Sequence, residues 1–252
     1  MLKKSIKNII ITIGDAAGVG PEIIAKALAD ERIRKKARIF ILGNHKVFRR
    51  FWNLELIKVV TDLVEYSPSC LNIINVGEVT KIVHGVPTID SARLAINALN
   101  VSLQMIKKHN ISAVVTAPIY KKGMLDAGFS FPGHTEFFST SFRSKVLMSF
   151  WSDRLKVATI TTHLPLKDVA VNINKKSVEE ALKIAFFSLR SMLGKDAPSI
   201  AVLGLNPHAG EDGKLGDEEK LILTPVCDDL REKGFNIYGP LPADTAFYQA
   251  LQ

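Results

Sequence analysis

Short runs of aliphatic residues alternate along the chain with stretches in which apolar residues recur every three or four positions. The runs predict β-strands, and the helical spacing of the other stretches predicts amphipathic helices between them. The predicted strands cover residues 8–13, 38–42, 111–116, 145–150, 155–161 and 199–205, and the predicted helices cover residues 21–29, 45–52, 90–108, 176–192 and 217–233. This alternation predicts an α/β fold in which parallel strands are joined by helices.

Length and apolar content set the scale of the molecule. The 252 residues suit one large domain or two small lobes, and an apolar fraction of 47% is typical of a protein with a buried core. No apolar run reaches the roughly 18 residues that a membrane-spanning helix needs. The two cysteines, Cys70 and Cys227, are far apart and form no metal-binding pair. We therefore expect a cytoplasmic protein without a membrane partner.

The chain is basic, with a formal net charge of +8. Such a charge suits nucleic acid, an acidic membrane surface or a small anionic substrate, and composition does not choose among them. The densest basic run covers residues 32–38, just after a predicted helix, where basic residues usually form a solvated helix end. Because no nucleic-acid-binding motif accompanies this run, we expect no nucleic acid partner.

A glycine-rich loop follows the first predicted strand. It contains Gly14, Asp15, Gly18 and Gly20, and Pro21 then begins a helix. Glycines at this junction let backbone N–H groups approach an anion at the helix N-terminus. The spacing differs from the common dinucleotide fingerprint G-x-G-x-x-G. A tight turn without any ligand is the alternative interpretation.

Two further loops carry groups that suit an anion. The segment Thr116-Ala117-Pro118 ends a predicted strand, where the ligand crevice of an α/β sheet commonly lies, and the pair Lys121-Lys122 follows it. Farther along the chain, a turn with His134 and Thr135 leads into a helix, with Thr135 near the N-cap. These two side chains, beside free backbone N–H groups, would contact a phosphate. Simple capping beside a surface histidine is the alternative.

Two histidines follow predicted strands farther along the chain. His163 comes after the strand at 155–161 and His208 after the strand at 199–205, each near a proline. Histidines placed in this way can converge on one metal ion: neutral imidazoles suit zinc, cobalt or nickel, whereas carboxylates and water suit magnesium or manganese. Taken singly, each histidine is more often a hydrogen-bonded structural residue. The other three histidines, His45, His84 and His109, receive no role.

Asp244 follows a segment that two prolines stiffen, Gly239-Pro240-Leu241-Pro242. A carboxylate in this place can orient a metal-binding histidine, hold a substrate or accept a proton. It can also cap a helix that begins near Thr245. The sequence leaves all of these interpretations open.

Together these motifs resemble one family, the 4-hydroxythreonine-4-phosphate dehydrogenases of vitamin B6 synthesis. The resemblance covers essentially the whole chain, because six motifs follow the family's order and spacing. The motifs are Gly14-Asp15 with Gly18 to Glu22, Thr116-Ala117-Pro118, Gly133-His134-Thr135-Glu136-Phe137-Phe138, Thr162-His163-Leu164-Pro165-Leu166, Gly204-Leu205-Asn206-Pro207-His208-Ala209-Gly210-Glu211 and Gly239-Pro240-Leu241-Pro242-Ala243-Asp244-Thr245.

The resemblance implies a three-layer α/β/α fold similar to that of the isocitrate and isopropylmalate dehydrogenases. Residues 1–252 would form one catalytic unit of two lobes, whose boundary the sequence does not define. The resemblance also implies a homodimer with its active sites at the subunit interface. Members of the family oxidise 4-phosphooxy-L-threonine with NAD, and NADP is an alternative cofactor. The β-keto acid then loses carbon dioxide to give 3-amino-2-oxopropyl phosphate in pyridoxal 5'-phosphate biosynthesis.

The resemblance also implies roles for single residues. His163 and His208 would bind a divalent metal such as zinc, magnesium or cobalt, His134 and Thr135 would contact the phosphorylated substrate, Gly14, Asp15 and Gly18 would lie near the cofactor, and Asp244 is the candidate catalytic residue. A metal ion bound to the substrate hydroxyl favours the alkoxide and later stabilises the enolate that decarboxylation leaves.

The sequence departs from the family pattern in three respects. Ala16 stands where the family usually has proline, and Tyr120 stands where asparagine is common. Family members are also longer, so we expect the C-terminal part of the family fold, which carries a third metal-binding histidine, to be absent from residues 1–252. The alternative functions are a related dehydrogenase for another phosphorylated hydroxy acid and a catalytically inactive, truncated homologue.

Overall fold

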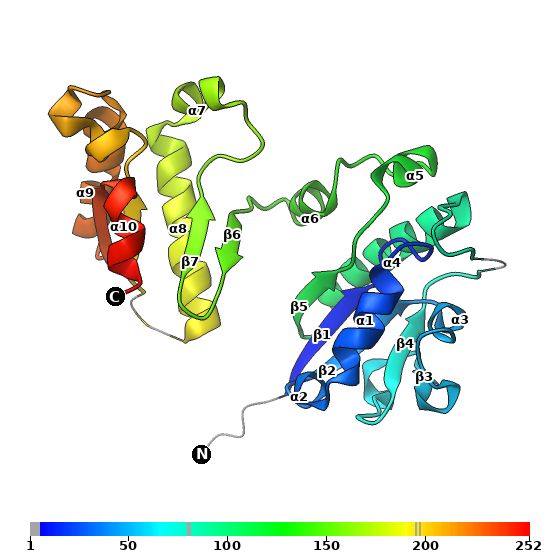
Figure 1. Ribbon diagram of the computed structural model, residues 1–252. Helices are drawn as coiled ribbons and strands as arrows, with labels where there is room; N and C mark the ends of the chain where they lie inside the picture. The colour runs from blue at the N-terminus through cyan, green and yellow to red at the C-terminus, as the bar shows by residue number, and fades with distance from the viewer. Residues whose placement is uncertain (1–5, 80–81, 195, 197) are drawn as a thin grey trace, which may run out of the picture. The chain divides into compact units, whose positions relative to one another are not determined.

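The chain divides into two compact units, Met1–Ser144 and Lys145–Gln252, which we call unit 1 and unit 2. The structure is a computed structural model that describes residues 6–79, 82–194, 196 and 198–252 (Figure 1). Each unit has its own apolar core, and each is described by itself. That the two units together form one catalytic unit stays a prediction.

Unit 1 is built on a parallel sheet of five strands in the order β3-β4-β2-β1-β5. The strands are β1 (Lys7–Thr12), β2 (Ala37–Gly43), β3 (Ile57–Val59), β4 (Leu71–Asn75) and β5 (Ile111–Thr116). In β2, four successive residues from Ile39 to Leu42 are buried. Because successive side chains of a strand point to opposite faces, both faces of this sheet are covered.

Helices cover the two faces of this sheet. The helices of unit 1 are α1 (Gly20–Ala29), α2 (Glu31–Arg34), α3 (His45–Phe48), α4 (Ile89–Lys108), α5 (Lys121–Asp126) and α6 (His134–Phe142), with single 3₁₀ turns at Leu54–Leu56 and Leu63–Glu65. Helix α1 joins β1 to β2, and α4 joins β4 to β5 in the opposite direction along the sheet. Right-handed crossovers therefore place α1 and α4 on opposite faces, as Figure 1 shows.

The long helix α4 illustrates why the sequence folds in this way. Thr88 and Ser91 form a capping box at its N-terminus, and an apolar stripe continues from there. Leu94 and Ala98 from that stripe, with Ile24 and Leu28 of α1, belong to the core cluster that contains the central strands. Burial of these faces, rather than helix propensity alone, holds the helices in place.

Unit 2 contains two small sheets. Strands β6 (Met148–Trp151) and β7 (Lys156–Thr159) pair antiparallel, and β8 (Ile200–Leu203) and β9 (Ile237–Leu241) pair parallel. The helices are α7 (Leu166–Asn172), α8 (Lys175–Leu193), η4 (Glu219–Leu223), α9 (Thr224–Glu232) and α10 (Ala243–Ala250), and η3 (Pro207–Gly213) is a short turn segment. Side chains from α8, η4 and α9 bury β8 and β9, with Val178, Val202 and Leu230 at the centre of the core.

The α/β class that the sequence predicts is confirmed, since a parallel sheet flanked by helices forms unit 1. The predicted kinship with the isocitrate dehydrogenase fold stays a prediction. The prediction of parallel strands is wrong for those at 145–150 and 155–161. They form an antiparallel hairpin because a short turn joins them. None of the helices in the described ranges combines the length and the apolar character of a membrane span.

Two predicted helices differ from those observed. The helix predicted over 45–52 ends at Phe48, and the one predicted over 217–233 is a π-helical turn, η4, that continues directly into α9. Strands β3, β4 and β9 were not predicted. They are short, and polar or proline residues interrupt their apolar pattern, as Asn72 does in β4.

Candidate functional site

The glycine-rich loop lies against the segment Thr116-Ala117-Pro118 at the carboxyl ends of β1 and β5, whose last residues are partners in the sheet. The backbone N–H of Asp15 donates a hydrogen bond to the carbonyl of Pro118, at 2.9 Å. Gly14 has a φ of +70°, and a Cβ at this position would lie 2.3 Å from the same carbonyl oxygen. The two backbones are therefore close enough that only glycine fits at position 14.

Hydrogen bonds within the loop account for Asp15 and Gly18. Asp15 is buried, and its Oδ1 accepts a hydrogen bond from the backbone N–H of Ala17 at 3.0 Å. The N–H of Gly18 donates to the carbonyl of Asp15, also at 3.0 Å. These bonds support the interpretation as a closed turn. The contact of Gly14, Asp15 and Gly18 with a cofactor stays a prediction.

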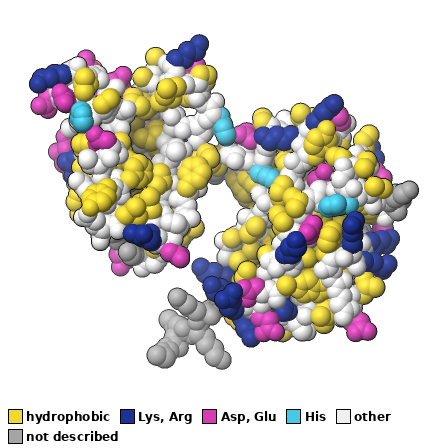
Figure 2. All heavy atoms as spheres, in the orientation of Figure 1, with side chains coloured by type: hydrophobic (Ala, Val, Ile, Leu, Met, Phe, Trp, Pro, Cys, Tyr) yellow, Lys and Arg dark blue, Asp and Glu magenta, His cyan; other side chains and the backbone are white. Residues whose placement is uncertain are grey.

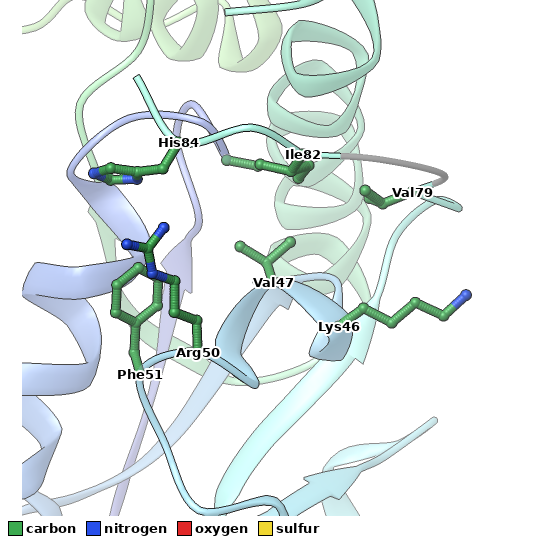
Figure 3. Close-up of a pocket in the computed structure, with 8 residues that line it drawn as sticks. Lys46, Val47, Arg50, Phe51, Val79, Ile82 and His84 are labelled. Carbon is green, nitrogen blue, oxygen red and sulfur yellow. The ribbon is translucent and has the colours of Figure 1, made fainter. Parts of the chain in front are cut away.

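A pocket of about 260 Å³ beside this loop was not foreseen from the sequence (Figure 3). Its lining residues are Ala16, Lys46, Val47, Arg50, Phe51, Val79, Ile82 and His84. Figure 3 shows Arg50 beside the ring of Phe51 and directed toward His84; Arg50 Cζ lies 5.9 Å from the Phe51 ring centroid. The N–H of Gly85 donates to the Ala17 carbonyl at 2.8 Å and so holds this wall against the glycine-rich loop. An apolar floor with a cationic rim suits an anionic ligand.

This pocket could not be predicted because its lining comes from three separate segments, of which only the glycine-rich loop with Ala16 carries a motif. Its one signal was His84, to which we gave no role. Only the pairing of β2 with β4 brings the α3 region and the segment after β4 to the same side of the loop.

His134 and Thr135 occupy the first two positions of α6, and Gly133 is the N-cap without a side-chain hydrogen bond. Thr135 therefore does not cap the helix, in contrast to the prediction. Nε2 of His134 is buried and has no hydrogen-bond partner. Burial lowers the pKa of His134, and the nearby ammonium of Lys121 lowers it further. An anionic ligand is one kind of group that can satisfy a buried ring nitrogen of this kind.

The side chains of His208 and Asp244 are in direct contact. Oδ2 of Asp244 lies 3.1 Å from Nδ1 of His208, and the two side chains are 47% and 60% exposed, respectively. Helix α10 begins at Ala243 with Pro242 as N-cap, so Asp244 does not cap it, and the capping interpretation is wrong. Nδ1 of His208 therefore faces the carboxylate of Asp244. Carboxylates orient metal-binding histidines in the same way.

His163 lies on the exposed loop between β7 and α7 and has a φ of +58°. The preceding strand, β7, belongs to a different sheet from β8, which precedes His208. Among the described residues, no group of three or more His, Cys, Asp or Glu side chains could hold a metal ion. His163 therefore does not join the pair of His208 and Asp244 in this structure. A metal ion shared by His163 and His208 stays a prediction, and the donor chemistry of His208 fits it.

The segment that carries His208 has an unusual backbone. Five successive residues, from His208 to Asp212, have φ between 43° and 81°, in the left-handed region, and only Gly210 among them lacks a Cβ. Such conformations are unfavourable for residues with a side chain and cluster at functional sites. No sequence pattern predicts this turn, because four of its five residues disfavour it.

A parallel α/β unit, together with a second unit in which a carboxylate lies beside an exposed imidazole, defines an α/β protein with a candidate metal site. Comparison with known proteins narrows this class. The sequence profile of the family "Pyridoxal phosphate biosynthetic protein PdxA" matches residues 35–252. The chain belongs to the PdxA family.

Individual relatives agree with this assignment. The D-threonate 4-phosphate dehydrogenase of Salmonella typhimurium is 34% identical, over 98% of this chain and 78% of its own. The 4-hydroxythreonine-4-phosphate dehydrogenase of Erwinia tasmaniensis is 32% identical, over 98% of this chain and 76% of its own. The predicted membership of a dehydrogenase family is therefore confirmed.

Solved structures show the same fold. The crystal structure of 4-hydroxythreonine-4-phosphate dehydrogenase from Klebsiella pneumoniae matches with a TM-score of 0.88 and 32% identity, over 98% of this chain and 77% of that one. A terephthalate 1,2-cis-dihydrodiol dehydrogenase from Burkholderia xenovorans matches with a TM-score of 0.72 at 23% identity, which shows the fold alone.

Proposed function

We propose that this protein is a metal-dependent dehydrogenase that oxidises and decarboxylates 4-phosphooxy-L-threonine with NAD or NADP. The observation that carries the proposal is the contact between Asp244 and His208, at 3.1 Å. A carboxylate at this distance supports the proposal because such a partner orients the imidazole of a metal ligand. The relatives named 4-hydroxythreonine-4-phosphate dehydrogenase supply the substrate class.

In this proposal, His208 and His163 hold a divalent cation, and the candidates are zinc, magnesium and cobalt. When bound, the cation stabilises negative charge that develops on the substrate oxygen. Asp244 acts through His208: its carboxylate, 3.1 Å from Nδ1, accepts a hydrogen bond from that nitrogen in this proposal and keeps the ring from turning. Both imidazoles are exposed, so a substrate reaches them from solvent.

The phosphate of the substrate is assigned to the N-terminus of α6. His134 supplies a ring nitrogen without a partner, Thr135 supplies an exposed hydroxyl, and Lys121 supplies a positive charge. The helix N-terminus adds backbone N–H groups that no side chain caps. The cofactor is assigned to the region of Gly14, where the pocket with Arg50 offers a cationic rim.

The proposal includes a homodimer in the cytoplasm. Strand β6 exposes Met148, Phe150 and Trp151, three large apolar side chains on one short strand. Figure 2 shows many apolar side chains exposed on the unit that contains this strand. Exposed apolar surface of this kind commonly marks a protein interface. Cys70 and Cys227 are free cysteines, which is compatible with a reducing compartment.

The test is an assay of NADH formation at 340 nm with the complete product of the gene that carries this sequence. We expect turnover with 4-phosphooxy-L-threonine, NAD and a divalent metal, and loss of that turnover after treatment with a chelator. Zinc, magnesium and cobalt are added back separately. If none of the three metals supports NADH formation with any phosphorylated hydroxy acid offered, the proposal is wrong.

A second substrate deserves the same assay, because the relative from Salmonella typhimurium is named D-threonate 4-phosphate dehydrogenase. The two substrates share the phosphate and the oxidised hydroxyl, so the same side chains serve both. Comparison of kcat/KM for the two compounds decides between them.

The pH dependence of anion binding tests the assignment of His134. Its pKa lies below the ordinary value of 6.5 because burial and Lys121 disfavour the imidazolium. A bound anion favours the imidazolium, so binding takes up a proton. We therefore expect the affinity for sulfate, whose charge is constant in this range, to rise as pH falls, by at most about tenfold per pH unit.

Calorimetry of sulfate binding between pH 7.5 and 5 measures this effect. His134→Asn should remove the rise, whereas Thr135→Ala should weaken binding and keep the slope. A sulfate affinity that does not change with pH in the unmodified protein would contradict the assignment.

A further inference from the structure

The left-handed turn that carries His208 encloses a buried carboxylate. Glu219, the first residue of η4, is only 4% exposed, although it carries a charged group. Its Oε1 accepts a hydrogen bond from the backbone N–H of Asn206 at 2.7 Å, and its Oε2 accepts one from Nδ2 of Asn206 at 2.9 Å. One carboxylate therefore holds both the main chain and the side chain of the residue that begins the turn.

The middle of the turn packs against the same carboxylate. A Cβ on Gly210 would lie 2.8 Å from Oε2 of Glu219, and one on Gly204 would lie 3.2 Å from Oε1. The two glycines thus bring the backbone on either side of Asn206 into contact with Glu219. Because left-handed residues with side chains are unfavourable, contacts outside the turn must hold them, and Glu219 supplies these contacts.

Glu219 is charged at neutral pH despite its burial. Burial alone raises the pKa of its carboxyl group. The hydrogen bonds from the backbone and side chain of Asn206, with further backbone bonds from Glu219 itself and Leu205, outweigh burial and bring the pKa below its ordinary value. An ionised carboxylate accepts all of these bonds, whereas a protonated one or an amide does not.

A short and stiff path leads from this anchor to His208. Only Pro207 separates Asn206 from His208, and its ring fixes one of the backbone angles between them. The N–H of Ala209 donates to the carbonyl of Asn206 at 3.2 Å, which closes the turn around His208. A shift of Asn206 is therefore transmitted directly to the imidazole that Asp244 holds.

We propose that Glu219 is a positioning residue for His208: its carboxylate fixes Asn206 and the left-handed turn, and so keeps Nδ1 of His208 on Asp244. The inference rests on the proposed function in one respect, namely that His208 binds a metal ion. The π-helical turn that Glu219 begins fits this role, since such turns are frequent at functional sites.

The test compares Glu219→Gln with a matched control, Glu218→Gln. Glu218 accepts a hydrogen bond from the same Nδ2 of Asn206, at 2.7 Å, but is only partly buried and does not contact the main chain of that residue. We expect Glu219→Gln to lower the affinity for Co²⁺ by about 10-fold to 100-fold, as loss of an orienting partner does, and Glu218→Gln to change it less than about threefold. Calorimetric titration with Co²⁺ gives both values.

Two further readouts separate positioning from a general loss of structure. The Nδ1–H proton signal of His208 in NMR spectra at pH 7, identified by its loss in His208→Ala, should shift or broaden in Glu219→Gln and stay in place in Glu218→Gln. In addition, the losses of Co²⁺ affinity in Glu219→Gln and Asp244→Asn should not add up. The double variant should bind Co²⁺ about as weakly as the single variant that has the lower affinity. The inference would be overturned if the fold losses of Co²⁺ affinity in the two single variants multiplied in the double variant, or if the His208 signal did not change in Glu219→Gln.

The NMR readout also keeps the two proposals apart. If the unmodified protein does not bind Co²⁺, the proposed metal site is wrong, and the His208 signal still decides whether Glu219 positions this side chain. If Glu219→Gln does not fold, Asn206→Ala takes its place, because it removes the side-chain half of the anchor. That variant should weaken the His208 signal, and an unaltered signal would overturn the inference.

Discussion

Replacement of His208 by alanine is expected to lower the affinity of this protein for Co²⁺ by at least about 100-fold, because even the loss of a partner that only orients a ligand costs about 10-fold to 100-fold. The structure gives His208 the properties of a ligand. Oδ2 of Asp244 lies 3.1 Å from Nδ1, and the His208 side chain is 60% exposed. His163→Ala should have an effect of similar size if the two histidines share the ion.

Two other variants define the scale of this effect. Asp244→Asn keeps the size of the side chain and removes its charge, so it should lower the affinity by about 10-fold to 100-fold. His109→Ala is the matched control, because His109 ends α4 in unit 1 and has no predicted role. It should change the affinity less than about twofold. If His208→Ala binds Co²⁺ as tightly as the unmodified protein does, His208 is not a ligand.

Gly14→Ala is expected to destabilise unit 1 by about 3 kcal/mol, combining the strain of a left-handed residue that has a Cβ with that of overpacking. The new Cβ would lie 2.3 Å from the carbonyl oxygen of Pro118 and 2.8 Å from the carbonyl carbon and oxygen of Ala117. These are main-chain atoms at the ends of packed strands, so they cannot move aside as a flexible side chain would.

Gly18→Ala provides the control within the same loop. Its φ lies outside the left-handed region, and the nearest atom to its Cβ would be the Asp15 carbonyl oxygen at 3.4 Å. This substitution should change stability by less than about 0.5 kcal/mol. Urea denaturation followed by circular dichroism measures both variants. Unchanged stability of Gly14→Ala, together with lost NADH binding, would instead make Gly14 a cofactor residue and contradict the packing argument.

The most extensively buried strands and helices could be predicted from the sequence because their burial determines the pattern of apolar residues. Strand β2 is a continuous apolar run since both of its faces are covered, and α4 and α8 each carry a long apolar stripe behind a capping box. Strand β4 could not be predicted from the sequence, because Asn72 interrupts its apolar run. That side chain is 2% exposed and is satisfied by the backbone carbonyls of Ser67 and Cys70, partners that only the folded chain supplies.

The candidate site, like the fold, could be predicted only in part from the sequence. The sequence by itself placed His163, His208, His134 and Asp244 after strands or at helix starts and, through six motifs in register, determined the family. Only the tertiary structure decided that Asp244 holds His208 instead of capping α10, and that Glu219 holds the left-handed turn. The physical reason is that motifs record local backbone and residue type, whereas these contacts join segments distant in sequence, whose approach is fixed by the burial of β8, β9 and α9 in one core.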